Sequence, residues 1–292
     1  MIMKRTFFLF LACLFLSGSA QNKVVIKNPV EINVMTINVR YANSGDGINS
    51  WEHRKERVVN AILSYGVDIL GTQEVLFQSQ LTYLESALPD YKSIGVGRKD
   101  GKEQGEYSAI FYNSTRFTEL SSGYFWLSEN PDAVGVKGWD AAYERIATWA
   151  RLKEKTSGKI IFVLNTHLDH IGKIARRESV KLIQNKVKLY SKKLPVIVTG
   201  DFNADPESDV IKSMTDKHNS LHLTDSRAVS PIVNGPAWSF HDFGRIPPEK
   251  RELIDYIFLK NKINVLKYEV IDGTQNDNFI SDHNPVWIKV QF

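Results

Sequence analysis

The chain has 292 residues, of which 42% are hydrophobic, 24% charged and 11% aromatic, and its formal net charge is +4. These proportions are typical of a globular protein, and they exclude a disordered chain, a collagen-like chain and a coiled coil. A chain of this length can bury enough surface to fold without disulfides or a structural metal.

The first twenty residues have the features of a secretory signal. Lys4 and Arg5 precede an apolar run at 6–16, and small residues follow it up to Ala20. We predict cleavage after Ala20, so that residues 1–20 are the signal peptide and the mature protein is secreted or periplasmic. The apolar run is too short to span a bilayer comfortably, and the mature chain has no predicted transmembrane segment. Lipid attachment at Cys13 is an alternative.

The mature chain, residues 21–292, has no cysteine, because Cys13 is the single cysteine of the sequence. Disulfides, a thiolate metal site and a cysteine nucleophile are therefore excluded. Removal of Lys4 and Arg5 without any acidic residue lowers the net charge to +2. This near-neutral charge offers no general electrostatic support for nucleic-acid binding. No repeat or linker divides residues 21–292, which we predict to form a single domain.

Two kinds of hydrophobic pattern alternate along the chain. Short β-branched and apolar runs predict strands, and apolar residues at helical spacing between charges predict helices. The predicted elements, in order, are strand 31–40, helix 51–65, strand 67–73, helix 77–88, strands 107–112, 145–153 and 159–166, helix 172–190, and strands 194–199, 253–259, 265–271 and 285–290. This interleaving predicts a layered α/β protein with mixed sheets.

Polar residues gather where the apolar strands end, which is where α/β proteins tend to place their sites. Asp201 and Asn203 follow a buried strand two positions apart, so their side chains can point to the same side. They can supply oxygen ligands or hold a water molecule, although Asp, Asn and Gly are also common in turns. Glu74 closes another strand, either as a divalent-cation ligand or as a first-turn helix residue.

A carboxylate inside an apolar strand is costly unless it is paired. Asp255 is such a residue, and His167 and the Asp282-His283 pair lie at other strand ends, so a histidine is its natural partner. A purely structural ion pair is the alternative. The sequence contains no Gly-x-Ser-x-Gly elbow, phosphate-binding loop or His-Glu-x-x-His helix. The remaining residues suit metal-assisted hydrolysis by water, without a covalent nucleophile.

The strand endings, taken in order, resemble those of the endonuclease/exonuclease/phosphatase superfamily. They are Asn38, Gln73-Glu74, Asn165-Thr-His-Leu168, Gly200-Asp-Phe-Asn203, Ile254-Asp-Tyr256 and Ser281-Asp-His283. That superfamily includes pancreatic-type deoxyribonucleases, deadenylases, inositol-polyphosphate 5-phosphatases and bacterial sphingomyelinases. The resemblance is strongest to secreted bacterial members, and it covers nearly the whole mature chain. It implies a four-layered α/β sandwich, in which two mixed sheets pack face to face with helices outside.

The resemblance also implies roles for these residues. Glu74 would hold Mg²⁺ or Mn²⁺, with Asn38 beside it and Asp282 as a further ligand. His283 would be the base that activates water, and Asp255 would orient its other ring nitrogen.

The remaining residues would contact the substrate. Asp201 and Asn203 would position the attacking water and a phosphate oxygen, and His167 would donate hydrogen bonds to the phosphate or act as an acid near the leaving group. Arg40 would clamp a phosphate, Glu106 would be an acidic partner of a histidine, and Arg145 would also contact substrate.

The predicted function is that of a secreted, divalent-metal-dependent enzyme that hydrolyses a phosphodiester or a phosphomonoester. Its partner would be a phosphate-ester substrate, either a small molecule, a lipid headgroup or nucleic acid, and no obligate protein partner is evident. A nuclease of the same superfamily is the first alternative, and a non-catalytic binding protein on this fold is the second. Loops 43–51, 129–143 and 231–250 are the candidates for substrate selection.

Overall fold

The computed structural model describes residue 2 and residues 29–273 and 278–292. Apart from Ile2, the predicted signal peptide therefore lies outside the described residues. Among the helices of the described ranges, none combines the length and the apolar character needed to cross a membrane.

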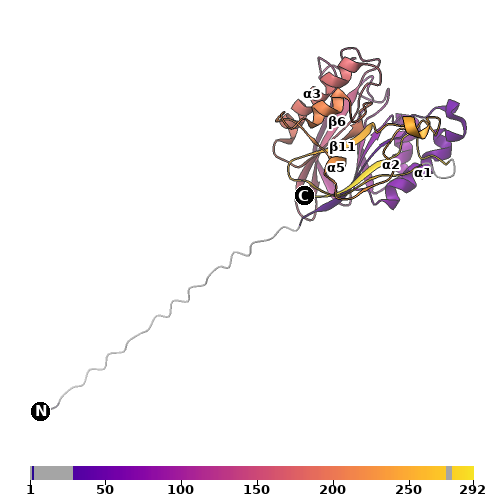
Figure 1. The fold of residues 1–292 in the computed structure, drawn as a ribbon. Coiled ribbons are helices and arrows are strands. Elements are labelled where there is room, and N and C mark those ends of the chain that lie inside the picture. Colours follow the sequence, from indigo (N-terminus) through magenta and orange to yellow (C-terminus); the bar gives the residue numbers. More distant parts are fainter. Residues whose placement is uncertain (1, 3–28, 274–277) are drawn as a thin grey trace.

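Two mixed sheets form the centre of the described part of the chain (Figure 1). The first has seven strands, in the order β10 (Val233–Asn234), β12 (Asn264–Val270), β13 (Val286–Gln291), β1 (Glu31–Asn38), β2 (Ile69–Gln73), β4 (Ile110–Asn113) and β3 (Tyr91–Ile94). The second has six, in the order β5 (Phe117–Trp126), β6 (Ile146–Glu154), β7 (Ile160–His167), β8 (Val196–Asp201), β11 (Asp255–Lys260) and β9 (Thr224–Asp225). Strand β1 is parallel to β2 and β7 is parallel to β8, while their other pairings are antiparallel.

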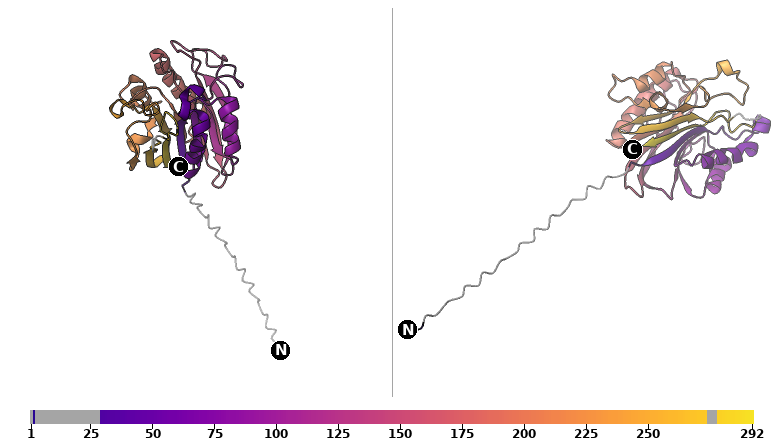
Figure 2. Two further views of the ribbon diagram at one scale, coloured as in Figure 1. Left: turned by 90° about the vertical axis from the view of Figure 1, so that its right-hand side faces the viewer. Right: turned by 60° about the horizontal axis from the view of Figure 1, so that its bottom comes forward.

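Helices cover the outer faces of the two sheets (Figures 1 and 2). The α-helices are α1 (Trp51–Ser64), α2 (Thr82–Ala87), α3 (Lys173–Ser191), α4 (Asp209–Thr215) and α5 (Ser226–Val229). Shorter turns of helix occur at η1 (Ser44–Asn49), η2 (Phe77–Leu81) and η3 (Pro248–Lys250). Helices α1 and α2 lie on one flank and α3 lies on the opposite flank.

The layering follows from strands that are apolar on both faces. In β1, Val34 belongs to the core between the sheets, whereas Met35 and Ile37 belong to a second core under α1 and α2. All three side chains are fully buried. Such strands occur when a sheet is covered on both sides, so the predicted four-layered α/β sandwich is confirmed.

A polar bridge joins the two sheets just below the strand ends. Gln73 of β2 donates through Nε2 to Asn165 Oδ1 of β7 at 2.7 Å, and Thr199 of β8 donates to the same oxygen at 3.0 Å. The Asn165 amide in turn donates to the carbonyl oxygens of Thr72 and Ala109. These hydrogen bonds satisfy groups that would be costly to bury alone, and they tie the strand ends of both sheets together.

Gly71 lets the sheets approach closely at this bridge. A Cβ atom at Gly71 would lie 2.2 Å from Thr199 Oγ1 and 2.6 Å from Asn165 Oδ1. We expect Gly71→Ala to lower the free energy of unfolding by about 1–3 kcal/mol, since neither side chain can move without breaking the bridge. Urea unfolding would measure this. Gly45→Ala is the control, because the three atoms nearest to its Cβ all belong to the Asn43 side chain, at 3.2 Å or more, and equal stability of both variants would contradict the prediction.

Most predicted elements are present, with ends shifted by one to three residues. The sequence-based prediction missed β5, an edge strand whose middle residues Ser121, Ser122 and Gly123 lack the expected alternation. It also missed the short strands β3, β9 and β10. The predicted helix 77–88 is a π-helical turn, η2, followed by α2. Strand β1 ends at Asn38, because Arg40 has a left-handed backbone with φ of 54°.

Candidate active site

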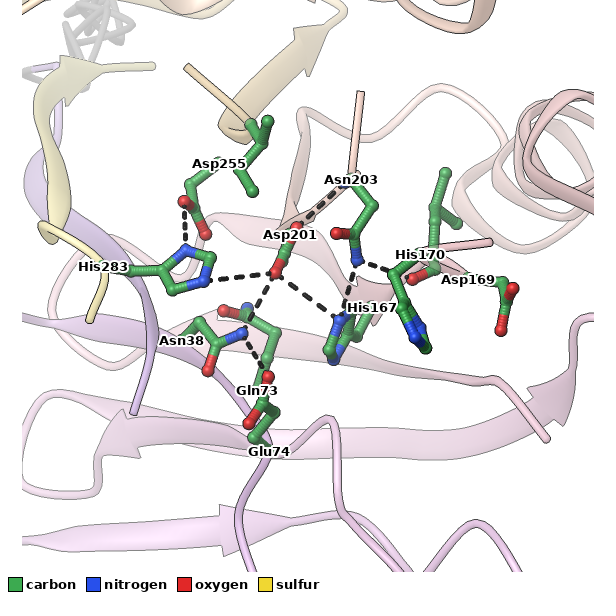
Figure 3. A network of polar contacts seen from close by, with 12 residues as sticks. Asn38, Gln73, Glu74, His167, Asp169, His170, Asp201, Asn203, Asp255 and His283 are labelled. Carbon is green, nitrogen blue, oxygen red and sulfur yellow. Dashed lines mark hydrogen bonds and ion pairs between the residues drawn. The ribbon is translucent and has the colours of Figure 1, made fainter. Parts of the chain in front are cut away.

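The site lies where strand ends from both sheets meet at one edge of the sandwich. Asn38, His167 and Asp201 end β1, β7 and β8, and Glu74 follows β2. Because β11 is antiparallel to β8, its first residue Asp255 stands opposite Asp201. The sheet registers thus gather residues that are far apart in sequence (Figure 3).

His283 and Asp255 form a buried pair on one side of the site. Nδ1 of His283 is 2.8 Å from Asp255 Oδ2, and His283 Nε2 is 3.8 Å from Asp201 Oδ2. Burial alone would lower the pKa of His283, but the charges of Asp255, Asp201 and Asp282 raise it to about 10. Phe240 packs on the imidazole, with 4.7 Å between ring centroids. The Asp255 contact therefore leaves Nε2 as the nitrogen that can face a reacting group.

Asp201 occupies the centre of the network (Figure 3). Its Oδ2 accepts a hydrogen bond from Asn38 Nδ2 at 3.0 Å and lies 3.5 Å from His167 Nε2. Its Oδ1 accepts from the backbone N–H of Asn203 at 2.9 Å. Burial and the charge of Asp255 raise the pKa of Asp201 to about 7. The carboxyl group is thus held between two imidazoles at the floor of the site.

His167 is buried beside Asn203. Asn203 Nδ2 is 3.0 Å from His167 Nε2 and donates to the Leu168 carbonyl oxygen at 3.0 Å. Burial, together with the charges of Arg145 and Arg98, lowers the pKa of His167 well below 6.5, so the imidazole is neutral at pH 7. Of the two predicted roles of His167, hydrogen bonding fits this environment better than proton donation does.

Glu74 and Asp282 supply oxygen donors on the opposite side of Asn38. Asn38 Nδ2 donates to Glu74 Oε1 at 2.8 Å, and the other Glu74 oxygen accepts from the backbone N–H of Tyr41. Asn38 Oδ1 accepts from the backbone N–H of Arg40 at 2.9 Å. In these contacts Asn38 holds Glu74 and Asp201 in place, while its predicted role as a direct metal ligand stays a prediction.

The charges around Glu74 and Asp282 fit a divalent cation. Burial raises the pKa of Asp282 to about 6, and the charge of Glu74 contributes to this rise against the opposing charge of His283. Two carboxylates that repel each other in a buried site are stabilised by a cation between them, and their hard oxygen atoms suit Mg²⁺ or Mn²⁺. A second group of potential ligands, Asp201, Asp255 and His283, also has its donor atoms within 4.8 Å of one another.

Two buried polar residues missed by the sequence-based prediction hold the loop that follows β1. Arg54 of α1 donates to the carbonyl oxygens of Val39, Arg40, Asn49 and Ile280. Gln80 donates to the Arg40 carbonyl oxygen and accepts the backbone N–H groups of Ala42 and Leu76.

The contacts to its carbonyl oxygen stabilise the left-handed backbone at Arg40, where φ is 54°. Glu74 is also left-handed, with φ of 62°. Such conformations are unfavourable for non-glycine residues and persist only where the surroundings hold them. Arg54 could have been found from the sequence, because it lies on the apolar face of its helix between Trp51 and Val58.

A cavity of about 620 Å³ opens over the network. One end is lined by Glu74, Asp201, Asn203, Asp282 and His283, whereas Asn38, His167 and Asp255 lie behind this lining. Arg40 also lines this end, and its guanidinium pairs with Asp46 at 3.1 Å and lies 3.8 Å from Asp282. Of the three predicted substrate loops, 129–143 contributes Tyr143 and 231–250 contributes Phe240 and Asp242, whereas 43–51 contributes no residue to the lining.

Glu106 and Arg145 also line the cavity, and the predicted contact of Arg145 with the substrate stays a prediction. Glu106 accepts two hydrogen bonds from the Arg98 guanidinium, at 2.7 and 2.9 Å. Among the described residues, no hydrogen bond joins Glu106 to a histidine, so its predicted role as a histidine partner is not supported. Arg145 instead contacts His170, with 3.0 Å between Nη2 and Nδ1.

His241 lies in loop 231–250 and is fully buried, stacked on Phe279. Burial, then the charges of His283 and Arg251, lower the pKa of His241 to about 3. The folded protein therefore holds His241 neutral, whereas an unfolded chain protonates it below about pH 6.5. Because the unfolded state then binds more protons, His241 removes stability as the pH falls below 6.5.

We expect the metal-free protein to lose stability between pH 6.5 and 5 more steeply than the His241→Gln variant does. The contribution of one such histidine is at most about 1.4 kcal/mol per pH unit. Urea unfolding at pH 7.5, 6.0 and 5.0 gives both slopes. His53→Gln at an exposed position is the matched control and should keep the wild-type slope. Equal slopes for wild type and His241→Gln would contradict the assignment.

Comparisons with known proteins identify relatives along nearly the whole described chain. Residues 35–283 match the sequence profile of the Endonuclease/Exonuclease/phosphatase family. A solved protein of that description from Bacteroides vulgatus is 43% identical, with a TM-score of 0.86, and the match covers 89% of this chain and 98% of that one. The mannosyl-6-phosphatase Bt3783 of Bacteroides thetaiotaomicron is 36% identical, with a TM-score of 0.82, and the match covers 89% and 100% of the two chains.

Among curated relatives, mouse nocturnin is 30% identical over 227 residues, which are 71% of this chain. The match covers 49% of nocturnin, so this chain spans about half the length of that relative.

Proposed function

Because this chain belongs to the endonuclease/exonuclease/phosphatase family, we propose that it is a divalent-metal-dependent phosphoesterase in which His283 activates the attacking water. The observation that carries the proposal is the His283–Asp255 pair, in which His283 lines one cavity together with Glu74 and Asp282 and Asp255 is buried behind it. A base, its orienting carboxylate and a set of hard oxygen donors are the groups that hydrolysis by water requires.

The residues around His283 have different roles in the proposed reaction. With a pKa of about 10, His283 is protonated at pH 7 in the metal-free protein, and the positive charge of a bound cation would lower that pKa. Neutral His283 accepts the proton of the water at Nε2, while Asp255 accepts a hydrogen bond from Nδ1–H and stabilises the imidazolium that forms. Asp201 orients the water next to His283, because its Oδ2 lies 3.8 Å from His283 Nε2.

Asn203 lines the cavity beside Asp201, and its amide nitrogen is 3.0 Å from Nε2 of the buried His167. Asn203 would lie next to the phosphate, and His167 would hold its side chain in place. A bound Mg²⁺ or Mn²⁺, held by Glu74 and Asp282, would stabilise the negative charge on the phosphate. Arg40 lines the same end of the cavity and adds positive charge there.

A small phosphorylated sugar is our first candidate for the substrate. This chain aligns with the whole length of a mannosyl-6-phosphatase at 36% identity. Its cavity of about 620 Å³ is also of the size that holds a small-molecule ligand. The second candidate is a nucleic acid, because curated relatives include nocturnin and the exoribonuclease subunit Ccr4.

The test is hydrolysis of a substrate panel, with Mg²⁺ or Mn²⁺ and again with EDTA, followed as phosphate release for the monoester and as strand cleavage or nitrophenolate release for the diesters. The panel contains mannose 6-phosphate, single-stranded RNA, plasmid DNA and bis-p-nitrophenyl phosphate. We expect metal-dependent turnover of the sugar phosphate that is largely insensitive to salt. Cleavage of RNA or DNA, with affinity that falls steeply as salt rises, would favour the nuclease instead. Turnover that persists in EDTA would overturn the proposed metal dependence.

We also propose that the protein is exported and loses residues 1–20. The support is the basic, apolar and small-residue order of this segment. Mass spectrometry of the protein expressed with its own N-terminus should show a chain that begins at Gln21. A lipidated chain that begins at Cys13 would support the alternative.

A further inference from the structure

We propose that the end of the cavity remote from His283 binds a second anionic group, a phosphate or a carboxylate, carried by the leaving group of the substrate. This inference rests on the proposed phosphoesterase function and narrows its substrate class. The residues concerned, named here the distal wall, are Arg98, Lys99, Tyr143, Arg145 and His170.

The topology separates the distal wall from the base. Arg98 and Lys99 lie between β3 and β4, which are on the side of β2 away from β13. Tyr143 and Arg145 lie between β5 and β6, on the side of β8 away from β11. In Figure 3, His170 lies beyond His167, on the side away from His283. Water activated at His283 attacks the phosphate from one side, so an in-line leaving group departs toward the distal wall.

Arg145 is a buried cation with unused hydrogen-bonding capacity. It is 4% exposed, its Nε is 3.3 Å from Asp169 Oδ2, and its Nη2 donates to His170 Nδ1. Its buried Nη1 has no hydrogen-bond partner among the described residues. A buried donor without an acceptor costs about 1–3 kcal/mol, and more when it is charged. Because Arg145 lines the cavity, its positive charge would attract an anionic ligand at this wall.

Two further donors of the distal wall are available to a ligand. Lys99 is exposed at the cavity and forms no ion pair with any described residue, whereas Arg98 is neutralised by Glu106. The imidazole of His170 accepts from Arg145 at Nδ1, because a guanidinium only donates, and its proton is therefore on Nε2. The distal wall thus combines an ammonium group, an imidazole N–H and a guanidinium.

The distal wall is held rigidly before any ligand binds. Asp169 accepts backbone N–H groups from Ala142 and Tyr143 on one loop and from Ile171 and Gly172 on another. Burial would raise the pKa of Asp169, but these donors and the charge of Arg145 lower it well below its usual range.

The other side of the distal wall is also fixed. The indole of the buried Trp126 donates to the Arg98 carbonyl oxygen at 2.7 Å. Donors fixed in this way bind a ligand with a small entropic cost.

The test compares three substrates with one six-carbon chain and a 6-phosphate. Glucitol 6-phosphate has a neutral leaving group, 6-phosphogluconate adds a carboxylate, and glucitol 1,6-bisphosphate adds a second phosphate. One charge-assisted hydrogen bond corresponds to about 1.5–3 kcal/mol, so we expect kcat/KM to be at least about tenfold higher for one or both of the doubly anionic compounds. The better of the two identifies the second group.

Lys99→Gln is the diagnostic variant, because Lys99 is exposed and can be replaced without burying an unpaired charge. It should raise the KM of the preferred doubly anionic substrate about tenfold more than that of glucitol 6-phosphate. Lys102→Gln, an exposed lysine of the same loop outside the cavity lining, is the matched control and should behave as wild type. An equal loss on all three substrates would place Lys99 at the scissile phosphate and overturn the inference.

Binding separates this inference from the proposed function. Calorimetric titration of the inactive His283→Asn variant with each compound needs no turnover. Tighter binding of a doubly anionic compound, lost in the Lys99→Gln double variant, would support the distal wall even if none of the three is hydrolysed. Equal affinities for all three compounds would overturn the inference, whereas absence of metal-dependent hydrolysis of any phosphate ester would count against the proposed function alone.

Discussion

The His283→Asn variant is expected to lose about 10²–10⁴-fold in kcat on the best substrate of the panel, because the water then has no base. Asparagine approximates the size of the ring but cannot accept the proton at Nε2. The surrounding contacts, including the stacking of Phe240, lose little buried area, so the variant should fold. Steady-state kinetics with saturating Mg²⁺ would measure the loss, and a thermal melt would confirm the fold.

The Asp255→Asn variant tests the contribution of the other member of the His283–Asp255 pair. The amide can still contact His283 Nδ1, which now lies 2.8 Å from the carboxylate, but it cannot stabilise the imidazolium. We expect a loss of about 10²-fold or more in kcat with a smaller change in KM. His53→Asn at an exposed position is the control. If both site variants kept near wild-type turnover, His283 would not be the base.

The Glu74→Gln variant is expected to need at least about tenfold more Mg²⁺ or Mn²⁺ for half-maximal activity. Glutamine keeps the size of the side chain and one acceptor oxygen for Asn38, but it loses the acceptor of the Tyr41 N–H and the negative charge that would attract the cation. Calorimetric titration with Mn²⁺ gives a second readout that does not depend on turnover. Asp282→Asn should shift the metal requirement in the same direction.

The control for this series is Glu52→Gln, an acidic residue on the exposed face of α1 whose ion pair is with Lys55. It removes the same charge without touching the site, and its metal requirement should equal that of the wild type. If Glu74→Gln and Asp282→Asn both had the metal requirement of the wild type, the cation would bind at another site. Asp201, Asp255 and His283 would then be the next group to test.

Several features could be predicted from the sequence because their signals are local. Apolar runs with β-branched residues showed the central strands, and α1 and α3 had clear helical spacing. Asp255 was recognisable because a charge inside an apolar strand requires a partner. The edge strand β5 was missed because its residues 118–124 are exposed or half-buried on both faces, so burial does not impose an alternating pattern on them.

The family and the chemical type of the site residues were thus determined by the sequence, whereas their pairing was decided by the tertiary structure. Asp255 faces His283 and not His167 because β11 lies beyond β8, on the side opposite β7. Arg145 pairs with Asp169 and His170, which follow another strand, and Arg98 pairs with Glu106 inside the loop between β3 and β4. The energies of such contacts depend on burial and distance. Neither quantity exists until the two sheets have packed.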